Sequence, residues 1–374
     1  LPAEWRNIVI YSESGQDWHQ FSGLIDELNG PLDCRTCYVT SDANDPGLQR
    51  EHPNYMALCI SEGLFLTIFF QVNRSDLFVL TMMDLDNLQL KRSLHPVHYL
   101  YLFHSMGSTH MVDNENSFDH YETLFCAGPH QVAEIRRREE LKNLPAKHLF
   151  DYGHPRLEEV IEQGNAWQRP KPEHEPPVLL IAPTWGETSI FNTCGRELID
   201  VLLNAEFQVI MRPHYQSNKQ TPDVIHAVRS AFDGHERFEY IDQQGETESI
   251  LRSDVLICDW SAMALEYGLG LEKPVLFIDV PRRIRNPNWQ ELGIEAIENS
   301  MRTQLGEVLS PDDLQSAPAA IERLLADPGR FRDDIRALRE STVFRLGHSV
   351  VDGAAEIARL AEQQRGVGSA GKNV

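Results

Sequence analysis

The sequence predicts an α/β protein built from two Rossmann-like, doubly wound domains. Strand-like apolar runs alternate with helical patterns along the 374 residues, and this alternation is typical of parallel strands connected by helices. The strand-like runs are apolar at nearly every position, as expected when helices cover both faces of a sheet. The alternation breaks once, at residues 162–177, where Pro, Glu and Lys gather without periodicity. We interpret that break as a linker between two domains.

In the N-terminal half, a strand within 7–15 and a helix within 16–30 form the first strand–turn–helix unit. Further strands are predicted at 64–70, 76–82, 97–103 and 123–128, and a helix at 129–144. The run 64–72, "LFLTIFFQV", is the most apolar in the chain. It is too short to cross a membrane and runs into polar residues, so we interpret it as a buried strand.

In the C-terminal half, a second series begins with the strand 177–185. The following strands are predicted at 207–215, 237–242, 254–260 and 274–280, and the helices at 195–206, 221–232, 247–253 and 261–270. A last helix at 349–364 leads into a tail whose Gly, Ser and Lys indicate disorder. The predicted domains are therefore 1–162, a linker at 163–177, 178–345, and a closing segment at 346–374.

Composition excludes several classes of partner. The formal net charge of −22 argues against nucleic acid, which is bound through a basic face, and against holding anionic lipid by bulk charge. Cys34 and Cys37 form a C-x-x-C, but no second pair follows at zinc spacing. We therefore predict reduced thiols in a strand of a cytoplasmic protein and no metal site. No signal-peptide pattern and no apolar run of ~18 residues is found.

Polar side chains that carry chemistry follow four of the predicted strands. They are His104 and Ser105, then Thr184 and Gly186, then Arg212 and His214, and finally Asp259 and Ser261 with Glu266 in the next helix. Ligands of open parallel sheets bind at the carboxyl ends of the strands. We therefore expect these residues to line a cleft between the two domains. For His104, the alternative is a packed residue at a strand end.

Two of these groups suit a phosphate. Arg212 and His214 are one residue apart on an extended segment, so we expect them to point the same way and form a two-pronged anion clamp. Ser261 is predicted at a helix N-terminus, where its hydroxyl and free N–H groups suit a phosphate. The alternative is that Asp259 or Ser261 only caps the helix.

Five stretches resemble one known family. They are "LFHSMGSTHM" (102–111), "YGHPRLEEV" (152–160), "LIAPTWGE" (180–187), "VIMRPHY" (209–215) and "SDVLICDWSAMALEYGLGLEKPVLFID" (253–279). They resemble the CDP-glycerol glycerophosphotransferase family, the teichoic-acid polymerases and primases with a GT-B fold. The resemblance covers roughly residues 98–350 and implies a GT-B fold with two Rossmann-like domains facing across a cleft.

The resemblance implies roles for the matched residues. His104 is implied as the general base that deprotonates an acceptor hydroxyl, which makes the N-terminal domain the acceptor side. Arg212 and His214 are implied to contact the donor phosphates, and we count His214 with His104 as catalytic. Ser261, after Asp259, is implied at the donor diphosphate. The other expected donor contacts are Thr184, Gly186 and Glu266.

The chain also departs from the family pattern. Ser105 stands where the family has Gly, and Ala262 replaces a second serine. Five further residues either contact the acceptor or a phosphate, or have only a structural role. Ser105, Arg282, Arg283, Arg285 and Ser349 are these candidates. If they bind no ligand, the three arginines lie on a solvated loop and Ser349 only caps the last helix. We expect that helix to return toward the N-terminal domain.

The leading hypothesis is a transferase that moves glycerol phosphate, or a similar polyol phosphate, from a CDP-activated donor to a hydroxyl of a cell-surface glycan or polymer. It would need no cofactor, and it would be cytoplasmic with peripheral association at the inner membrane face. The acceptor would be a glycan, a lipid-linked molecule or a polymer. One alternative is a GT-B glycosyltransferase or epimerase using a UDP-sugar. A second is a non-catalytic nucleotide-sugar-binding protein.

Overall fold

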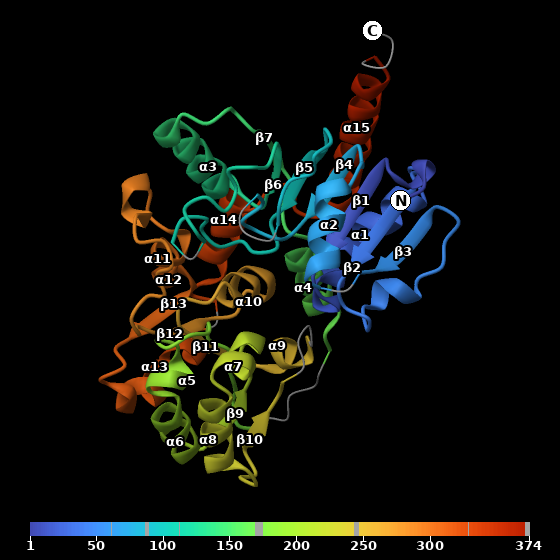
Figure 1. The fold of residues 1–374 in the computed structure, drawn as a ribbon. Coiled ribbons are helices and arrows are strands. Elements are labelled where there is room, and N and C mark those ends of the chain that lie inside the picture. The colour runs from blue at the N-terminus through green and yellow to red at the C-terminus, as the bar shows by residue number, and fades with distance from the viewer. Residues whose placement is uncertain are drawn as a thin grey trace. The chain divides into compact units, whose positions relative to one another are not determined.

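The computed structural model describes residues 1–60, 62–86, 90–111, 113–168, 175–242, 247–327 and 329–370. They form two units (Figure 1). Unit 1 comprises Leu1–Arg156, Asn288–Leu292 and Val343–Val374, and unit 2 comprises Leu157–Pro287 and Gly293–Thr342. Each unit contains one sheet whose neighbouring strands are parallel. The predicted fold class, two parallel-sheet α/β domains, is confirmed.

Unit 1 is built on a seven-stranded sheet in the order β3-β2-β1-β4-β5-β6-β7. Its strands are β1 (Ile8–Ser12), β2 (Thr36–Thr40), β3 (Tyr55–Cys59), β4 (Leu77–Leu80), β5 (His98–Leu102), β6 (Thr123–Cys126) and β7 (His148–Asp151). Tyr11 of β1 lies opposite Leu80 of β4, which lies opposite Tyr101 of β5. The strand order reverses between β1 and β4, as in doubly wound sheets, so the residues that follow β1, β4 and β5 share one edge.

Helices cover both faces of this sheet. They are α1 (Trp18–Asn29), α2 (Leu64–Val72), α3 (Pro129–Lys142) and α15 (Ser349–Ala370), with the short 3₁₀ helices η1 (Ala3–Trp5), η2 (Gly15–Asp17), η3 (Pro46–Gln49) and η4 (Trp289–Leu292). On one face, Ile357 of α15 and Leu24 of α1 join the core beneath β1 and β5. On the other, Phe70 of α2 and Ile135 of α3 pack on the opposite side chains of the same strands.

The run 64–72 is a helix, α2, and its prediction as a buried strand is wrong. Only one side of α2 is covered: Phe70 is 1% exposed, whereas Leu64 and Phe65 are 72% and 70% exposed. Because the exposed side is also apolar, the run shows no periodicity that would separate a helix from a strand. The strand that precedes this run is β3 at Tyr55–Cys59, which lies at the edge of the sheet.

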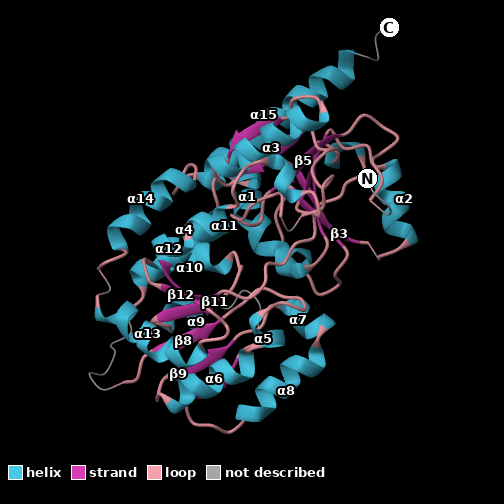
Figure 2. Cartoon of the chain, turned by 90° about the vertical axis from the view of Figure 1, so that its left-hand side faces the viewer, coloured by secondary structure: helices cyan, strands magenta, loops and turns pink. Residues whose placement is uncertain are grey.

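Unit 2 repeats the same winding with six strands in the order β10-β9-β8-β11-β12-β13. The strands are β8 (Val178–Ile181), β9 (Gln208–Met211), β10 (Phe238–Tyr240), β11 (Val255–Cys258), β12 (Val275–Ile278) and β13 (Gly306–Leu309). The helices are α4 (Pro155–Ala166), α5 (Ile190–Thr193), α6 (Gly195–Asn204), α7 (Tyr215–Gln220), α8 (Pro222–Phe232), α9 (Glu248–Arg252), α10 (Met263–Leu271), α11 (Ile297–Ser300), α12 (Arg302–Leu305), α13 (Ala317–Ala326), α14 (Arg332–Thr342) and η5 (Leu314–Ser316). Figure 2 shows these strands between helices.

The boundaries between the two units differ from the predicted domain boundaries. The chain passes from unit 1 to unit 2 after Arg156, inside α4, whereas the predicted linker begins at 163. Residues 169–174 of that linker lie outside the described residues. The helix α15 belongs to unit 1 and continues to Ala370, so residues 365–370 are helical where a tail was predicted. No helix of the described ranges is long and apolar enough to span a bilayer.

Gly153 provides a test of how the last segment is held in unit 1. Its φ is +93°, and a Cβ there would lie 2.3 Å from Phe344 O and from Ser349 Oγ. Gly153→Ala is expected to destabilise the protein by about 2–4 kcal/mol, since left-handed strain and overpacking add. Gly347→Ala is the matched control, because Gly347 has φ +82° with no atom in the way and would cost only about 1 kcal/mol. Equal melting temperatures for the two variants in scanning calorimetry would contradict this packing.

Candidate active site

His104 lies two residues beyond the end of the buried strand β5, and its side chain is exposed. Its Nδ1 lies 3.5 Å from the hydroxyl of Tyr101, a long contact. The turn at residues 105–107 is fixed by Gln131 of α3, whose side-chain amide donates hydrogen bonds to Ser105 O and Gly107 O at 2.9 and 3.0 Å. The Ser105 hydroxyl accepts the Gly107 N–H at 3.2 Å. The strand end thus presents an accessible imidazole on a fixed loop.

The protein around His104 changes its titration. Although the side chain is exposed, desolvation lowers the pKa of its imidazole from 6.5 to about 4, and the nearby His154 and His19 lower it further. At neutral pH the ring is therefore uncharged and able to accept a proton, which is the form a general base requires.

His110 lies on the same loop but in a different environment. It is 1% exposed, and its Nδ1 lies 3.4 Å from Oε1 of the fully buried Glu134. The other carboxylate oxygen of Glu134 accepts the Thr109 N–H at 2.6 Å and the Thr109 hydroxyl at 2.8 Å. The ring centroid of Trp289, in η4, lies 6.2 Å from that of His110. His110 is therefore part of the core of unit 1, and sequence reasoning did not find Glu134 as its partner.

In unit 2, Asp259 follows β11 and is 1% exposed. Its two carboxylate oxygens accept the N–H groups of Thr184 at 2.8 Å and Ile190 at 3.2 Å. Burial raises the pKa of this carboxyl to about 6, while the backbone hydrogen bonds oppose that rise. Asp259 therefore holds the loop 184–190, which follows β8, and does not project toward a ligand as we expected.

His214 follows β9 and is the N-cap residue of α7. Its Nδ1 accepts the Gln216 N–H at 3.1 Å, so in the neutral ring the proton resides on Nε2. The ring stacks on Tyr215 with centroids 4.8 Å apart. Burial, and then the charge of Arg283, lowers the pKa of His214 to about 4. At neutral pH, His214 is thus an uncharged ring that offers one N–H.

A stack of side chains brings three loops of unit 2 together. The guanidinium of Arg283, after β12, lies 3.3 Å from the ring centroid of Trp185, after β8. The Trp185 ring lies 6.2 Å from that of His214, after β9. Gly186 has φ +106°, and a Cβ there would lie 3.8 Å from Arg283. We call Arg283, Trp185 and His214 the Trp185 stack. Sequence reasoning gave no role to Trp185, although its position in the loop that follows β8 was a usable signal.

Arg212 does not lie on the surface beside His214. It is 6% exposed, and its Nη1 donates to the Ser249 hydroxyl at 3.2 Å. Its backbone N–H still donates to Ile181 O at 3.0 Å, so Arg212 continues the strand ladder and its side chain lies inside unit 2, beside α9. The structure therefore buries Arg212 inside unit 2, whereas His214 takes part in the Trp185 stack, and their role as a two-pronged clamp stays a prediction.

The remaining predicted residues differ in accessibility. Ser261 is half-buried, and its Oγ accepts the Met263 N–H at 3.3 Å, as in the capping alternative. Arg282 donates to Asn299 Oδ1 at 2.7 Å and is half-buried, whereas Arg285 is exposed. Glu266, on α10, is half-buried. Ser349 is 0% exposed at the start of α15, so its hydroxyl is not available to a phosphate as we had considered.

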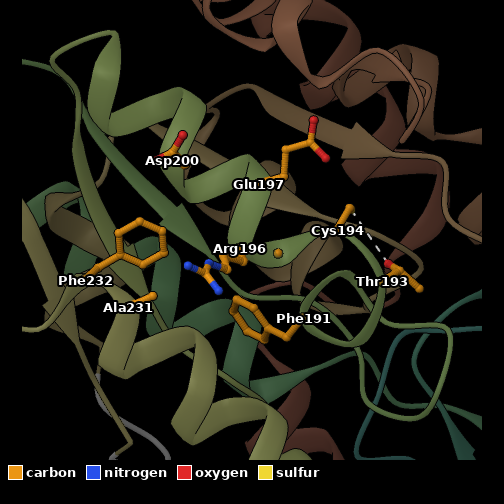
Figure 3. A pocket seen from close by; sticks show the side chains of 9 residues that line it. Phe191, Thr193, Cys194, Arg196, Glu197, Asp200, Ala231 and Phe232 are labelled. Atoms are coloured by element: carbon orange, nitrogen blue, oxygen red, sulfur yellow. Dashed lines mark hydrogen bonds between the residues drawn. The ribbon is translucent and has the colours of Figure 1, made fainter.

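A hollow of about 580 Å³ lies beside α5, α6 and α8 of unit 2 (Figure 3). Figure 3 shows Arg196 between Phe191 and Phe232 on its wall. None of the predicted site residues lines this hollow. We therefore place the candidate chemistry at the strand ends and not here.

Comparisons with solved structures identify the fold. The chain has a TM-score of 0.55 and 11% identity to the UDP-GlcNAc 2-epimerase from Neisseria meningitidis bound to UDP-GlcNAc, covering 95% of this chain and 99% of that one. A glycosyltransferase from Rickettsia africae gives 0.55 and 9% identity, with 94% and 98% covered. The UDP-GlcNAc 2-epimerase from Methanocaldococcus jannaschii, in complex with UDP-GlcNAc and UDP, gives 0.54 and 11%, with 89% and 98% covered. These structural neighbours are GT-B proteins, so the predicted GT-B fold is confirmed.

A search of curated protein sequences finds no match to the chain. A family model matches the middle of the chain, a segment that includes His104, His214, Asp259 and Ser261. Residues 103–280 match the model of the CDP-Glycerol:Poly(glycerophosphate) glycerophosphotransferase family, which confirms over this segment the family that the motifs resemble.

Proposed function

We propose that this protein transfers glycerol phosphate, or a similar polyol phosphate, from a CDP-activated donor to a hydroxyl of a cell-surface glycan or polymer. The observation that carries the proposal is the family match over residues 103–280, which includes both His104 and the Trp185–His214 part of the stack. Unit 1 supplies an accessible neutral imidazole, and unit 2 supplies a cation and an N–H donor at neighbouring strand ends.

In the proposed reaction, the neutral ring of His104 takes the proton of the acceptor hydroxyl. The acceptor oxygen forms a bond to the phosphorus of the glycerol phosphate, and the bond from that phosphorus to the oxygen of CMP breaks. CMP leaves with the bonding electrons, and His104 returns its proton to water. The products are CMP and an acceptor that carries a glycerol phosphodiester. No cofactor is required for this balance.

The Trp185 stack is proposed to hold the donor phosphates. Arg283 brings a positive charge, and the Nε2–H of His214 can donate to a phosphate oxygen. Arg212 is proposed to support the segment after β9, which carries His214, through its hydrogen bond to Ser249 inside unit 2. The N-terminus of α10, near Ser261, adds backbone N–H groups that favour an anion.

A donor comparison tests this proposal against its alternatives. The structural neighbours include proteins bound to UDP-GlcNAc or UDP, but at 9–12% identity they show the fold alone. We expect CDP-glycerol and CMP to raise the melting temperature of the protein more than UDP-GlcNAc and UDP do. Stabilisation by the uridine compounds alone would favour a UDP-sugar enzyme. Binding of CDP-glycerol without turnover would favour a non-catalytic binder.

The reaction is proposed to proceed without a divalent cation. Within the described ranges, no three His, Cys, Asp or Glu side chains are grouped as a metal ion would require. The charge on the donor phosphates would instead be met by Arg283. We expect CMP release to persist in excess chelator and not to rise when magnesium or manganese is added. Loss of turnover in chelator, with recovery on adding either metal, would contradict this expectation.

Peripheral association with a membrane is proposed on the basis of α2. Its exposed apolar side chains include Leu64, Phe65, Ile68 and Val72, an arrangement suited to the bilayer interface. Phe65→Ser is expected to lower the fraction of protein that sediments with phosphatidylcholine vesicles. Leu141→Ser is the matched control, since Leu141 is an exposed apolar residue of α3. Equal sedimentation of both variants and wild type would contradict a role for α2.

A further inference from the structure

A groove of about 1150 Å³ opens on unit 1. Its walls come from the residues after β1, from the start of α2, from the residues after β4 and from the loop 114–116. Tyr11, Leu66, Met82 and Met83 supply aromatic and apolar surface. We call this hollow the unit 1 groove. None of the residues predicted to act on the donor lines it.

The unit 1 groove and His104 lie at the same edge of the sheet. The strands β1, β4 and β5 are neighbours, and the groove follows β1 and β4 while His104 follows β5. A chain of contacts joins the two. The Tyr121 hydroxyl donates to Met82 O in the groove wall, and the rings of Tyr121 and Tyr101 are 5.3 Å apart. The Tyr101 hydroxyl is 3.5 Å from His104 Nδ1. An acceptor bound in the groove would therefore lie at the same sheet edge as the proposed base.

The charges of the groove have one sign. Glu13, Glu62, Asp84 and Glu115 line it, and none of its described lining residues is Lys, Arg or His. Of these four, Glu115 has a cation nearby, Lys142, at 3.6 Å.

Two basic residues, Lys91 and Arg92, follow the lining residue Leu90 in the sequence, and both bind groups that do not line the groove. Lys91 donates to Asp86 O at 3.0 Å, and Arg92 pairs with Glu122 at 2.6 Å. The negative charges of Glu13 and Glu62 also act on Tyr11 in the groove wall. Burial, and then Glu13 and Glu62, raises the pKa of Tyr11, although its hydrogen bond to Ser41 opposes this rise.

From this charge pattern we infer that the acceptor end that enters the unit 1 groove is an uncharged, hydroxyl-rich glycan and not a polyglycerophosphate chain. Carboxylates accept hydrogen bonds from sugar hydroxyls, and aromatic or apolar side chains contact the apolar faces of sugar rings. A chain of phosphodiesters would instead place like charges against the carboxylates, which disfavours binding. The inference rests on the proposed function, because it takes the groove as the acceptor site of that reaction.

Binding is tested on the full chain without donor, so that the result does not depend on turnover. Saturation-transfer NMR compares a neutral hexose oligosaccharide panel with a synthetic glycerol-phosphate oligomer of matched length. We expect neutral members to bind at least ~10-fold more tightly than the oligomer, a difference of the size that like-charge contacts produce. Glu62→Lys and Glu13→Lys should narrow or reverse that ratio. Glu4→Lys is the control, because Glu4 is exposed on unit 1 and does not line the groove.

Several outcomes would overturn the inference. They are equal or tighter binding of the glycerol-phosphate oligomer to wild type, binding of neither probe, and a ratio that Glu62→Lys changes no more than Glu4→Lys does. CMP release from CDP-glycerol is then measured with each probe present. If the neutral probes bind with the expected charge dependence but CDP-glycerol is never turned over, the groove assignment stands and the proposed donor reaction fails.

Discussion

His104→Ala is expected to lower kcat by about 10²–10⁴-fold, the usual contribution of a general base. The side chain is exposed and lies beyond the buried strand, so its removal should leave folding and donor affinity nearly unchanged. The measurements are the rate of CMP release at saturating donor and the dissociation constant of CDP-glycerol. A loss confined to kcat indicates an interaction made in the transition state. His120→Ala is the matched control, because His120 is an exposed histidine of the same unit.

The pH dependence of the wild type gives a second test of His104. Protonated His104 cannot take a proton, so kcat/KM falls as the pH drops through the pKa of the ring. Because that pKa is lowered from 6.5 to about 4, titration of His104 should cause almost no loss of kcat/KM between pH 7.5 and 5.5. Protonation of Asp259, whose pKa is about 6, should cause a smaller loss at the acid end. A histidine with the ordinary pKa would be about nine-tenths protonated at pH 5.5. A roughly tenfold loss of kcat/KM at that pH would contradict the lowered pKa of His104. Near-normal turnover by His104→Ala would contradict its assignment as the general base.

His214→Ala is expected to lower kcat/KM by about 10²-fold, because it removes a donor aimed at the phosphates. It also removes the cap of α7, since His214 Nδ1 accepts the Gln216 N–H, at a cost of about 1 kcal/mol in stability. Two variants separate these effects. His214→Asp keeps an acceptor for the cap but has no N–H, whereas His214→Asn keeps the cap and offers an N–H.

The order of activity among these variants decides the role of His214. We expect Asn to exceed both Asp and Ala in kcat/KM, while Asn and Asp have similar melting temperatures above that of Ala. If activity instead follows the melting temperature, with Asp equal to Asn, His214 acts only as the cap of α7. The role of the Nε2–H in donor binding would then be wrong.

Strand periodicity was enough to predict much of the fold. Fully buried strands such as β5 and β11 are apolar at nearly every position, and their alternation with helices predicted two parallel sheets. The same rule failed at 64–72, because an apolar helix with one exposed side has the composition of a buried strand. It also missed β3, β7 and β13, which lie at the sheet edges and are only partly buried.

The strand-end rule gave the positions of candidate residues but not their orientation. His104 follows β5 and is exposed, as expected for a residue delivered to a sheet edge. Alternation along an extended chain predicted that Arg212 and His214 would form one clamp, and the backbone of His214 is extended. The pattern did not encode the burial of Arg212 against Ser249 of α9. Contacts between distant loops, such as Arg283 on Trp185, depend on tertiary packing that local spacing does not encode.

The central claim is that a CDP-activated polyol phosphate is the donor and that His104 activates the acceptor. The most direct measurement is phosphorus NMR of CDP-glycerol incubated with enzyme and a neutral oligosaccharide acceptor, using wild type and His104→Ala in parallel. We predict that wild type produces CMP and a new phosphodiester resonance in equal amounts, and that His104→Ala binds the donor but produces neither at a comparable rate. Release of UDP from a UDP-sugar supplied in the same assay with CDP-glycerol left intact, or equal phosphodiester formation by both proteins, would contradict the claim.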